Sequence, residues 1–312
     1  MKRDKVRRRK LMLIIRRDWQ LYLFLLLPLA YIVIFKYVPM LGLQIAFRDY
    51  TPKGGIWGSE WVGLDNVIKF MESYQFGRVV RNTFLLSVYG LTLNTVIPIA
   101  FALIYNCIEL PRFKKVSQTI VTLPHFISVV VLVGIMMQLL NSRTGIYGIL
   151  YEKITGQYPG DLFGNPDAFR HLYVWSSVWQ GFGWNAIIYI ATLSGVDMGL
   201  HEAAQLDGAS RLQRIWHVDL PHLKPTIVIL LIMNVGRIMS VGFEKAFLMQ
   251  NTLNLQYSEL ISTYVYRVGL AASYGSNFSY AAAVDMFNSA LNLILVLCAN
   301  TVSKRVSETS LW

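Results

Sequence analysis

The residues best suited to chemistry in this sequence do not form a catalytic motif. His201-Glu202 begins like the H-E-x-x-H pair of zinc proteases, but Gln205 stands where the second histidine ligand is needed. The sequence has no Gly-Lys dipeptide, which excludes a G-x-x-x-x-G-K-[ST] phosphate loop. The five histidines show no metal-ligand spacing, and Cys107 and Cys298 lie in apolar runs typical of small buried side chains. We therefore expect neither an enzyme nor a metal site in this chain.

Polar side chains inside long apolar stretches are a second kind of candidate, because such groups usually face a pathway or cavity. Two stripes at helical spacing stand out: Asn234, Arg237 and Glu244 in one stretch, and Asp285, Asn288 and Asn292 in the next. Arg237 is the strongest single candidate for contact with a solute. Structural pairing of Arg237 with Glu244 or Asp285 is the competing interpretation.

A third group of candidates lies between residues 179 and 189. Gln180, Trp184, Asn185 and Tyr189 combine aromatic rings, which stack on sugars, with amides that bond to sugar hydroxyl groups. The alternative is that the rings pack between helices or at the membrane interface, and that the amides bond neighbouring helices. These residues are therefore candidates for a sugar path.

The composition requires an apolar solvent around these residues. Of the 312 residues, 54% are hydrophobic and only 15% are charged, against about 25% charged in an average globular protein. The net charge of +11 comes from Lys and Arg at chain ends and in short loops, which favours an anionic membrane surface over nucleic acid. A soluble protein and a disulfide-built secreted domain are excluded.

Charge-poor stretches predict an all-α integral membrane protein with six transmembrane helices. The predicted spans are 19–35, 82–108, 116–142, 171–196, a fifth from about Pro225 to Glu244 that contains Arg237, and a sixth from about 280 to 302. Residues 1–19 are expected to form a basic cytoplasmic tail, and 20–312 a single six-helix domain.

The distribution of basic residues predicts the orientation. With both termini inside, the inner segments carry 17 Lys and Arg and the longer outer segments carry 10. We expect an uncleaved first helix and a multi-pass protein of the cell membrane with cytoplasmic N- and C-termini. The segment 201–225 is then cytoplasmic.

The segment 201–225, HEAAQLDGASRLQRIWHVDLPHLKP, is predicted to form a helical elbow. A short helix should precede Gly208, and an amphipathic piece should follow it. Pro221 and Pro225 are then expected to end this piece and restart the chain into the bilayer. The pattern alone fits a docking element and an ordinary connecting loop equally well.

The elbow resembles the EAA loop of binding-protein-dependent ABC importer permeases. Glu202-Ala203-Ala204, three residues, Gly208, nine residues and Val218-Asp219-Leu220-Pro221 follow the family pattern, with Val218 in place of Ile. Asp207-Gly208-Ala209 resembles the variant of the maltose-transporter branch, as do WVGLDN at 61–66 and TLPHFISVVV at 122–131. The residues that the resemblance assigns to ATPase coupling are Glu202, Ala203, Ala204, Asp207, Gly208, Leu220 and Pro221.

The resemblance implies a type I ABC importer fold and a permease that moves an oligosaccharide inward. It further implies a heterodimeric pore with a second homologous permease, two ATPase subunits that use ATP and Mg, and an extracytoplasmic solute-binding protein. No cofactor is expected on this chain. If the path is cationic, acidic oligosaccharides become candidates. An ion-coupled secondary transporter of a polar solute is the alternative, although it needs no docking elbow.

Overall fold

The computed structural model describes residues 17–240, 242–271 and 275–307, so most of the predicted basic tail lies outside the described part. The regular structure of this part is helical apart from one antiparallel pair of two-residue strands, β1 (Arg48–Asp49) and β2 (Glu60–Trp61), in which Arg48 lies opposite Trp61. The predicted all-α class is confirmed. The helices before the elbow are α2 (Trp19–Ile32), η1 (Val33–Tyr37), α3 (Val38–Met40), η2 (Leu41–Phe47), α4 (Gly55–Gly58), α5 (Asp65–Glu72), α6 (Phe76–Asn106), α7 (Pro111–Thr122), η3 (Leu123–Phe126), α8 (Val129–Leu139), α9 (Ile146–Thr155) and α10 (Pro166–Leu193). From the elbow onward they are α11 (Met198–Leu206), α12 (Arg211–Arg214), η4 (Ile215–Asp219), α13 (Leu220–Val235), α14 (Phe243–Met249), α15 (Leu255–Ser258), α16 (Ile261–Gly269) and α17 (Phe278–Ser307).

Four helical stretches of the described chain are long and apolar enough to cross a membrane: Trp19–Phe47, Phe76–Asn106, Arg211–Val235 and Phe278–Lys304. The bent pair Pro111–Phe126 and Val129–Leu139 makes a fifth span if it is counted as one. The predicted span 171–196 falls on α10, a 28-residue helix made more polar by its amide and hydroxyl side chains. Each of the six predicted spans thus contains helical structure, and the predicted membrane fold is confirmed. The third and fifth predicted spans are not continuous helices over their predicted ranges.

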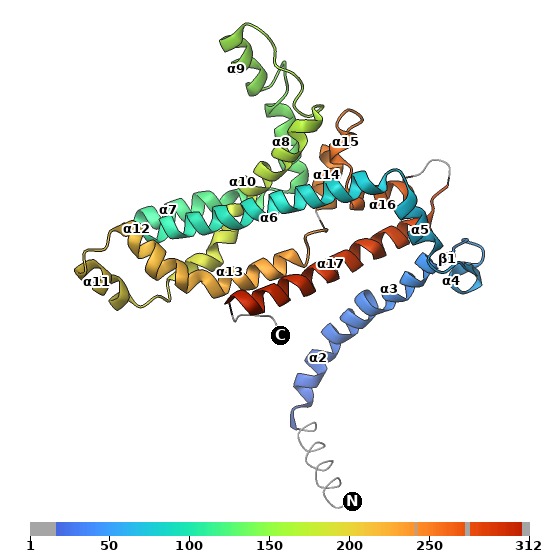
Figure 1. Ribbon diagram of the computed structural model, residues 1–312, viewed down its shortest axis with the longest axis horizontal. Coiled ribbons are helices and arrows are strands. Elements are labelled where there is room, and N and C mark those ends of the chain that lie inside the picture. The colour runs from blue at the N-terminus through green and yellow to red at the C-terminus, as the bar shows by residue number, and fades with distance from the viewer. Residues whose placement is uncertain (1–16, 241, 272–274, 308–312) are drawn as a thin grey trace, which may run out of the picture.

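The centre of the bundle is the packing of α6 against α10 (Figure 1). Leu86 of α6 and Val174 of α10 are buried in one apolar cluster there. Two further apolar clusters lie toward the two ends of the bundle and include residues of α13, α16 and α17. Their buried members are Phe70, Val79, Met239, Ile261, Tyr264 and Val284 at one end, and Ala102, Tyr189, Leu193, Val196 and Leu223 at the other.

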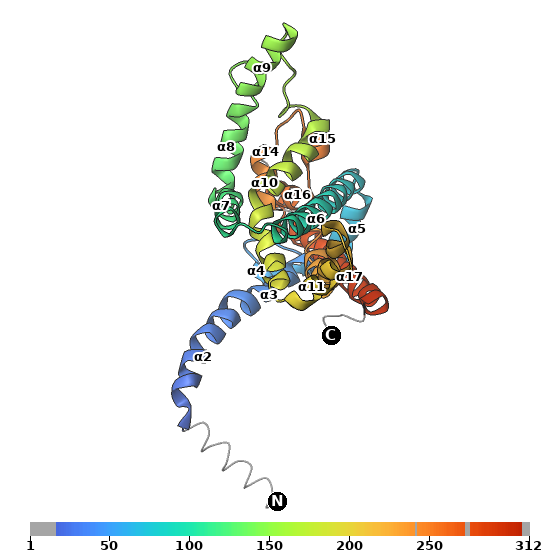
Figure 2. The ribbon, with the colours of Figure 1, turned by 90° about the vertical axis from the view of Figure 1, so that its left-hand side faces the viewer.

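Helix α2 stands apart from the bundle in both ribbon views (Figures 1 and 2). None of its residues is buried, although the helix is almost wholly apolar. Such a surface is unfavourable in water. The helix must therefore be covered by lipid or by another polypeptide.

The predicted third span, 116–142, is not one continuous helix. The chain bends by 96° between η3 and α8. Ile127 and Ser128 are extended, and the Ser128 hydroxyl accepts a hydrogen bond from the amide of Val131, which starts a new helix. The carbonyl of Ile127, freed by the break, accepts a bond of 2.7 Å from the Gln180 amide of α10. The break is thus held by a tertiary contact, and α8 and α9 project from the bundle (Figure 1).

The predicted fifth span is also wrong at both of its ends. The helical stretch runs without interruption from Arg211 to Val235, so Pro221 and Pro225 do not break it. Pro221 follows η4, a wide helical turn, and lies in the first turn of α13, where the missing N–H is tolerated. The chain then leaves the helix after Val235 and turns before α14 begins at Phe243.

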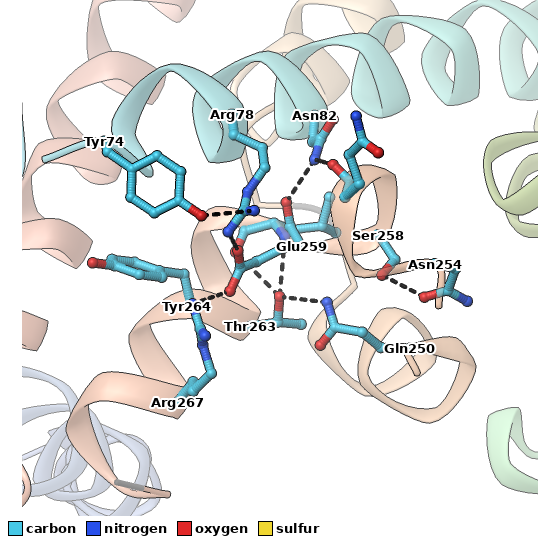
Figure 3. A network of polar contacts seen from close by, with 12 residues as sticks. Tyr74, Arg78, Asn82, Gln250, Asn254, Ser258, Glu259, Thr263, Tyr264 and Arg267 are labelled. Atoms are coloured by element: carbon cyan, nitrogen blue, oxygen red, sulfur yellow. Dashed lines mark hydrogen bonds and ion pairs between the residues drawn. The ribbon is translucent and has the colours of Figure 1, made fainter. Parts of the chain in front are cut away.

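A polar cluster around Glu259 (Figure 3) lies near α16, at the end of the bundle opposite the elbow (Figure 1). The carboxylate of Glu259 is 1% exposed and pairs with Arg78 of α6 and Arg267 of α16. Asn82 of α6 donates hydrogen bonds to the carbonyls of Gln256 and Glu259. These contacts tie the segment around α15 to α6, far from it in sequence.

Candidate functional site

A cavity of about 500 Å³ opens between α6, α10 and the end of α13. Five of the predicted path residues line it: Trp184, Asn185, Tyr189, Asn234 and Arg237. The other lining residues are Leu86, Ser87, Gly90, Leu91, Asn94, Thr95, Tyr173, Ile188, Leu230 and Ile238. Amides, hydroxyl groups, aromatic rings and one guanidinium thus surround a space of the size that holds a small ligand.

Helical periodicity explains which residues α10 contributes to the cavity. Trp184 and Ile188, like Asn185 and Tyr189, are four residues apart and therefore lie on one face of the helix. Trp184 is held by its neighbours: its ring stacks on His125 at a centroid distance of 4.4 Å, with 6° between the planes, and Phe126 meets its edge. The helix break at residues 127–128 thus adjoins the cavity wall.

Arg237 supplies the positive charge of the cavity wall. It lies in the turn after α13, and among the described residues no Asp or Glu lines the same cavity. The predicted alternatives, ion pairs with Glu244 or Asp285, are not formed within the described chain, where the ion pairs of Arg involve Asp18, Glu109 and Glu259. The cavity therefore has a cationic side that favours an anionic or strongly hydrogen-bonding solute.

Neither of the two predicted polar stripes lies as a whole on a helix face that lines this cavity. Glu244 lies in the first turn of α14, because the fifth helix ends before it. Asp285 lines a separate opening with Phe243 and Tyr266. Asn288 is buried away from both openings.

Two of the predicted amides brace the backbone. Gln180 holds the Ile127 carbonyl, as described above, and does not line the cavity. Asn292 accepts a bond from the Met239 amide and donates one to the Ser240 hydroxyl, so it secures the turn that carries Arg237. The side chains of Gln180 and Asn292 thus satisfy backbone groups that have no partner within a helix where the helices end.

Sequence reasoning missed the contribution of α6. Asn94 and Thr95, with Ser87 about two turns before them, face α10 across the cavity. The signal was present, because Asn94 is an amide inside the predicted span 82–108. The rule that selected Asn234 on the fifth span would have selected Asn94 as well.

The elbow lies at one tip of the molecule, beyond the ends of α6 and α10 (Figure 1). Asp197 caps α11 by accepting from the Gly199 amide at 2.9 Å, and Ser210 with Gln213 forms a capping box on α12. Gly208 joins the two helices with a left-handed φ of 80°, which favours glycine. The predicted pair of helical pieces around Gly208 is therefore present.

The predicted coupling residues lie on the outside of the elbow. Glu202, Ala203, Asp207 and Gly208 are exposed, and Ala204 is half-buried. Leu220 is half-buried and Pro221 exposed at the start of α13. Large apolar side chains near them are exposed: each of the following is more than half exposed, namely Met198, Leu200, Leu206, Leu212 and Trp216. An exposed apolar patch next to a carboxylate is typical of a protein-docking surface.

Three comparisons place the chain among known transporters. The family model for "Binding-protein-dependent transport system inner membrane component" matches residues 99–308. The polygalacturonan/rhamnogalacturonan transport system permease protein YteP of Bacillus subtilis (strain 168) is 39% identical over 308 residues, covering 99% of this chain and 95% of that protein.

Two crystal structures resemble the chain over nearly its whole length. A bacterial ABC transporter involved in the import of the acidic polysaccharide alginate has a chain with a TM-score of 0.87 and 36% identity, covering 96% of this chain and 99% of that chain. A bacterial alginate ABC transporter in complex with an alginate pentasaccharide-bound periplasmic protein gives a TM-score of 0.86 and 36% identity, covering 95% and 98%. These similarities favour an ABC importer permease over an ion-coupled carrier.

Proposed function

The chain belongs to the family of binding-protein-dependent transport system inner membrane components, and from this premise we propose that it moves an acidic oligosaccharide into the cell as the permease subunit of an ATP-driven importer. The choice of substrate depends on a single observation: Arg237 lines the cavity, and none of the described residues in the cavity wall is acidic. The relatives named for polygalacturonan and alginate carry uronate polymers, whose sugar carboxylates need a cationic partner.

The substrate would be held by three kinds of contact. Arg237 would pair with a sugar carboxylate, the amides of Asn94, Asn185 and Asn234 would bond to hydroxyl groups, and Trp184 would stack on a sugar ring. A neutral oligosaccharide would use the amides and the ring but would leave the guanidinium without a partner. Arg237 therefore distinguishes acidic from neutral cargo.

Energy and cargo would come from partner chains. We infer a second homologous permease that completes the pore, two ATPase subunits that bind ATP and Mg, and an extracytoplasmic binding protein that delivers the oligosaccharide. The chain has no phosphate loop of its own, and its elbow presents Glu202 and an exposed apolar patch to a partner. Both termini would lie in the cytoplasm of a cell-membrane protein, on the same side as the elbow and the ATPase.

The substrate is tested by uptake into proteoliposomes that contain the complete complex. We expect Arg237→Gln to reduce uptake of oligogalacturonate by about tenfold or more, the loss of one charge-assisted contact of about 1.5–3 kcal/mol. Arg237→Lys should retain part of the uptake because it keeps the charge. Equal uptake by the Arg237→Gln variant, or a wild type that prefers neutral maltotetraose, would refute the acidic substrate.

The elbow is tested separately from the substrate. We expect Gly208→Trp to reduce the transport of oligosaccharide per ATP hydrolysed, because a bulky side chain at this turn would hold the elbow off its partner. Gly156→Trp is the matched control, since Gly156 also has a positive φ and open space around it but follows α9. Uptake that persists without ATPase subunits and follows an ion gradient would refute the ATP-driven mechanism.

A further inference from the structure

Asp219 is a buried carboxylate that joins three elements at the elbow end of the bundle. Its side chain is 2% exposed and lies where η4 meets α13. Oδ1 accepts a hydrogen bond of 3.2 Å from the Asn106 amide at the end of α6. The same oxygen lies 3.3 Å from Nε2 of His201 in α11. One carboxylate therefore connects α6, α11 and the start of α13.

Helix α11 has few other attachments to the bundle. None of its residues is buried. His201 points inward, with 16% of its side chain exposed, while its neighbour Glu202 is exposed on the outer side. Successive residues of a helix point about 100° apart around its axis. The same turn of α11 can therefore present His201 to Asp219 and Glu202 to a docking partner.

Open space surrounds this contact. Asn106, His201 and Asp219 line a cavity of about 440 Å³ together with Met198, Gln205, Lys114, Arg211, Arg214 and Glu109. The remaining lining residues are Cys107 and Ile108. Since α11 is not packed into an apolar core, its position relative to α6 and α13 depends on directional polar contacts rather than on close packing. The space also leaves room for α11 to tilt about the contact.

We propose that Asp219 is a positioning residue that passes movement of α11 to α6 and α13 through His201 and Asn106. Asp219 lies where the elbow joins α13, and the far end of α13 carries the cavity residue Asn234 and leads into the turn with Arg237. A push on the outer face of α11 reaches α13 through the carboxylate, and Asn106 holds the end of α6 against the same oxygen. This inference rests on the proposed function, because it requires a partner that moves the elbow.

The test uses the complete complex and a reporter in the cavity. Native Cys107 and Cys298 are replaced by Ser, Asn94→Cys is introduced, and its rate of labelling by a thiol reagent is measured with and without ATP. ATP hydrolysis is measured in the same samples. His222→Gln is the matched control for His201→Gln, since it removes an exposed imidazole near the start of α13.

We expect Asp219→Asn and His201→Gln to reduce the ATP-dependent change in labelling by about two- to thirty-fold while ATP hydrolysis continues. The double variant should lose no more than the stronger single variant, because both changes break the same contact. A full change in labelling in both single variants would overturn the inference. If Asp219→Asn fails to assemble, the half-buried His201→Gln decides alone.

The same experiment separates this inference from the proposed function. A reporter that does not respond to ATP in the parent complex, or a complex without ATPase subunits, would overturn the proposed function. A parent complex that responds normally, with a Gly208→Trp variant that does not, would leave the proposed function standing while the Asp219 variants decide the inference.

Discussion

Gly183 is a position where one added methyl group should be costly. It lies on α10 where this helix crosses α7, and a Cβ at this position would overlap the carbonyl group of Val121, 2.5 Å from its carbon. A helix carbonyl cannot rotate out of the way as a side chain can. Gly183→Ala must therefore push α7 and α10 apart by about 1 Å or more, since ordinary contacts begin near 3.4 Å.

The cost follows from this overlap. Overpacking a well-packed interior costs about 1–3 kcal/mol, and we expect the upper end, about 3 kcal/mol, because the obstacle is backbone. At about 2–4 °C per kcal/mol, the unfolding midpoint should fall by about 6 °C or more. Transport should fall as well, because His125, which stacks on Trp184 in the cavity wall, follows α7 directly.

The assay is thermal unfolding of the purified complex in detergent, with Gly181→Ala as the control. Gly181 lies on the same helix, but a Cβ there would meet only the Asn185 amide at 3.5 Å, an ordinary contact. Both variants gain the same helix propensity. Equal midpoints for Gly183→Ala and Gly181→Ala would refute the close crossing of α7 and α10.

Three further changes have expected outcomes. Glu259→Gln should lower the free energy of unfolding by about 2–3 kcal/mol, because it removes the carboxylate that pairs with both Arg78 and Arg267. Glu72→Gln, at an exposed position, is the control in the same thermal assay. Ser128→Ala should cost about 1 kcal/mol and raise hydrogen exchange at the start of α8, because it removes the cap of that helix. Gly208→Ala should cost about 1 kcal/mol through its left-handed backbone alone, since the space around it is open, whereas Gly208→Asn should cost less; unfolding in denaturant measures both.

The helix break and the elbow show what the sequence could predict and what it could not. The caps Asp197 and Ser210 and the turn at Gly208 are local signals, so the elbow is predictable from its own residues. The break at Ile127–Ser128 lies within a long apolar run, so the hydropathy of the sequence does not reveal it. Its stability depends on a bond from Gln180, more than fifty residues away, which no local pattern contains.

The cavity shows the same limit for single residues. Polar side chains in spans are costly, and this rule correctly selects Asn185, Asn234 and Arg237 for the cavity wall. The same rule fails for Asn292, because an amide in a span can instead satisfy a backbone turn. Which of the two roles applies depends on where helices end, and the end of α13 at Val235 was not visible in the sequence.

The geometry of α13 connects the two halves of the proposed mechanism. The helix has 16 residues and so rises about 24 Å, with Asp219 at its elbow end and Asn234 and Arg237 at the cavity end. A stiff rod of that length displaces its far end by about 4 Å when it tilts by about 10°, which is comparable with the shifts seen in allosteric helices. A modest movement of the elbow would therefore move the guanidinium of Arg237 by more than a hydrogen-bond length. Cargo that is held in one state would then be released in the other without any change in the residues that line the cavity.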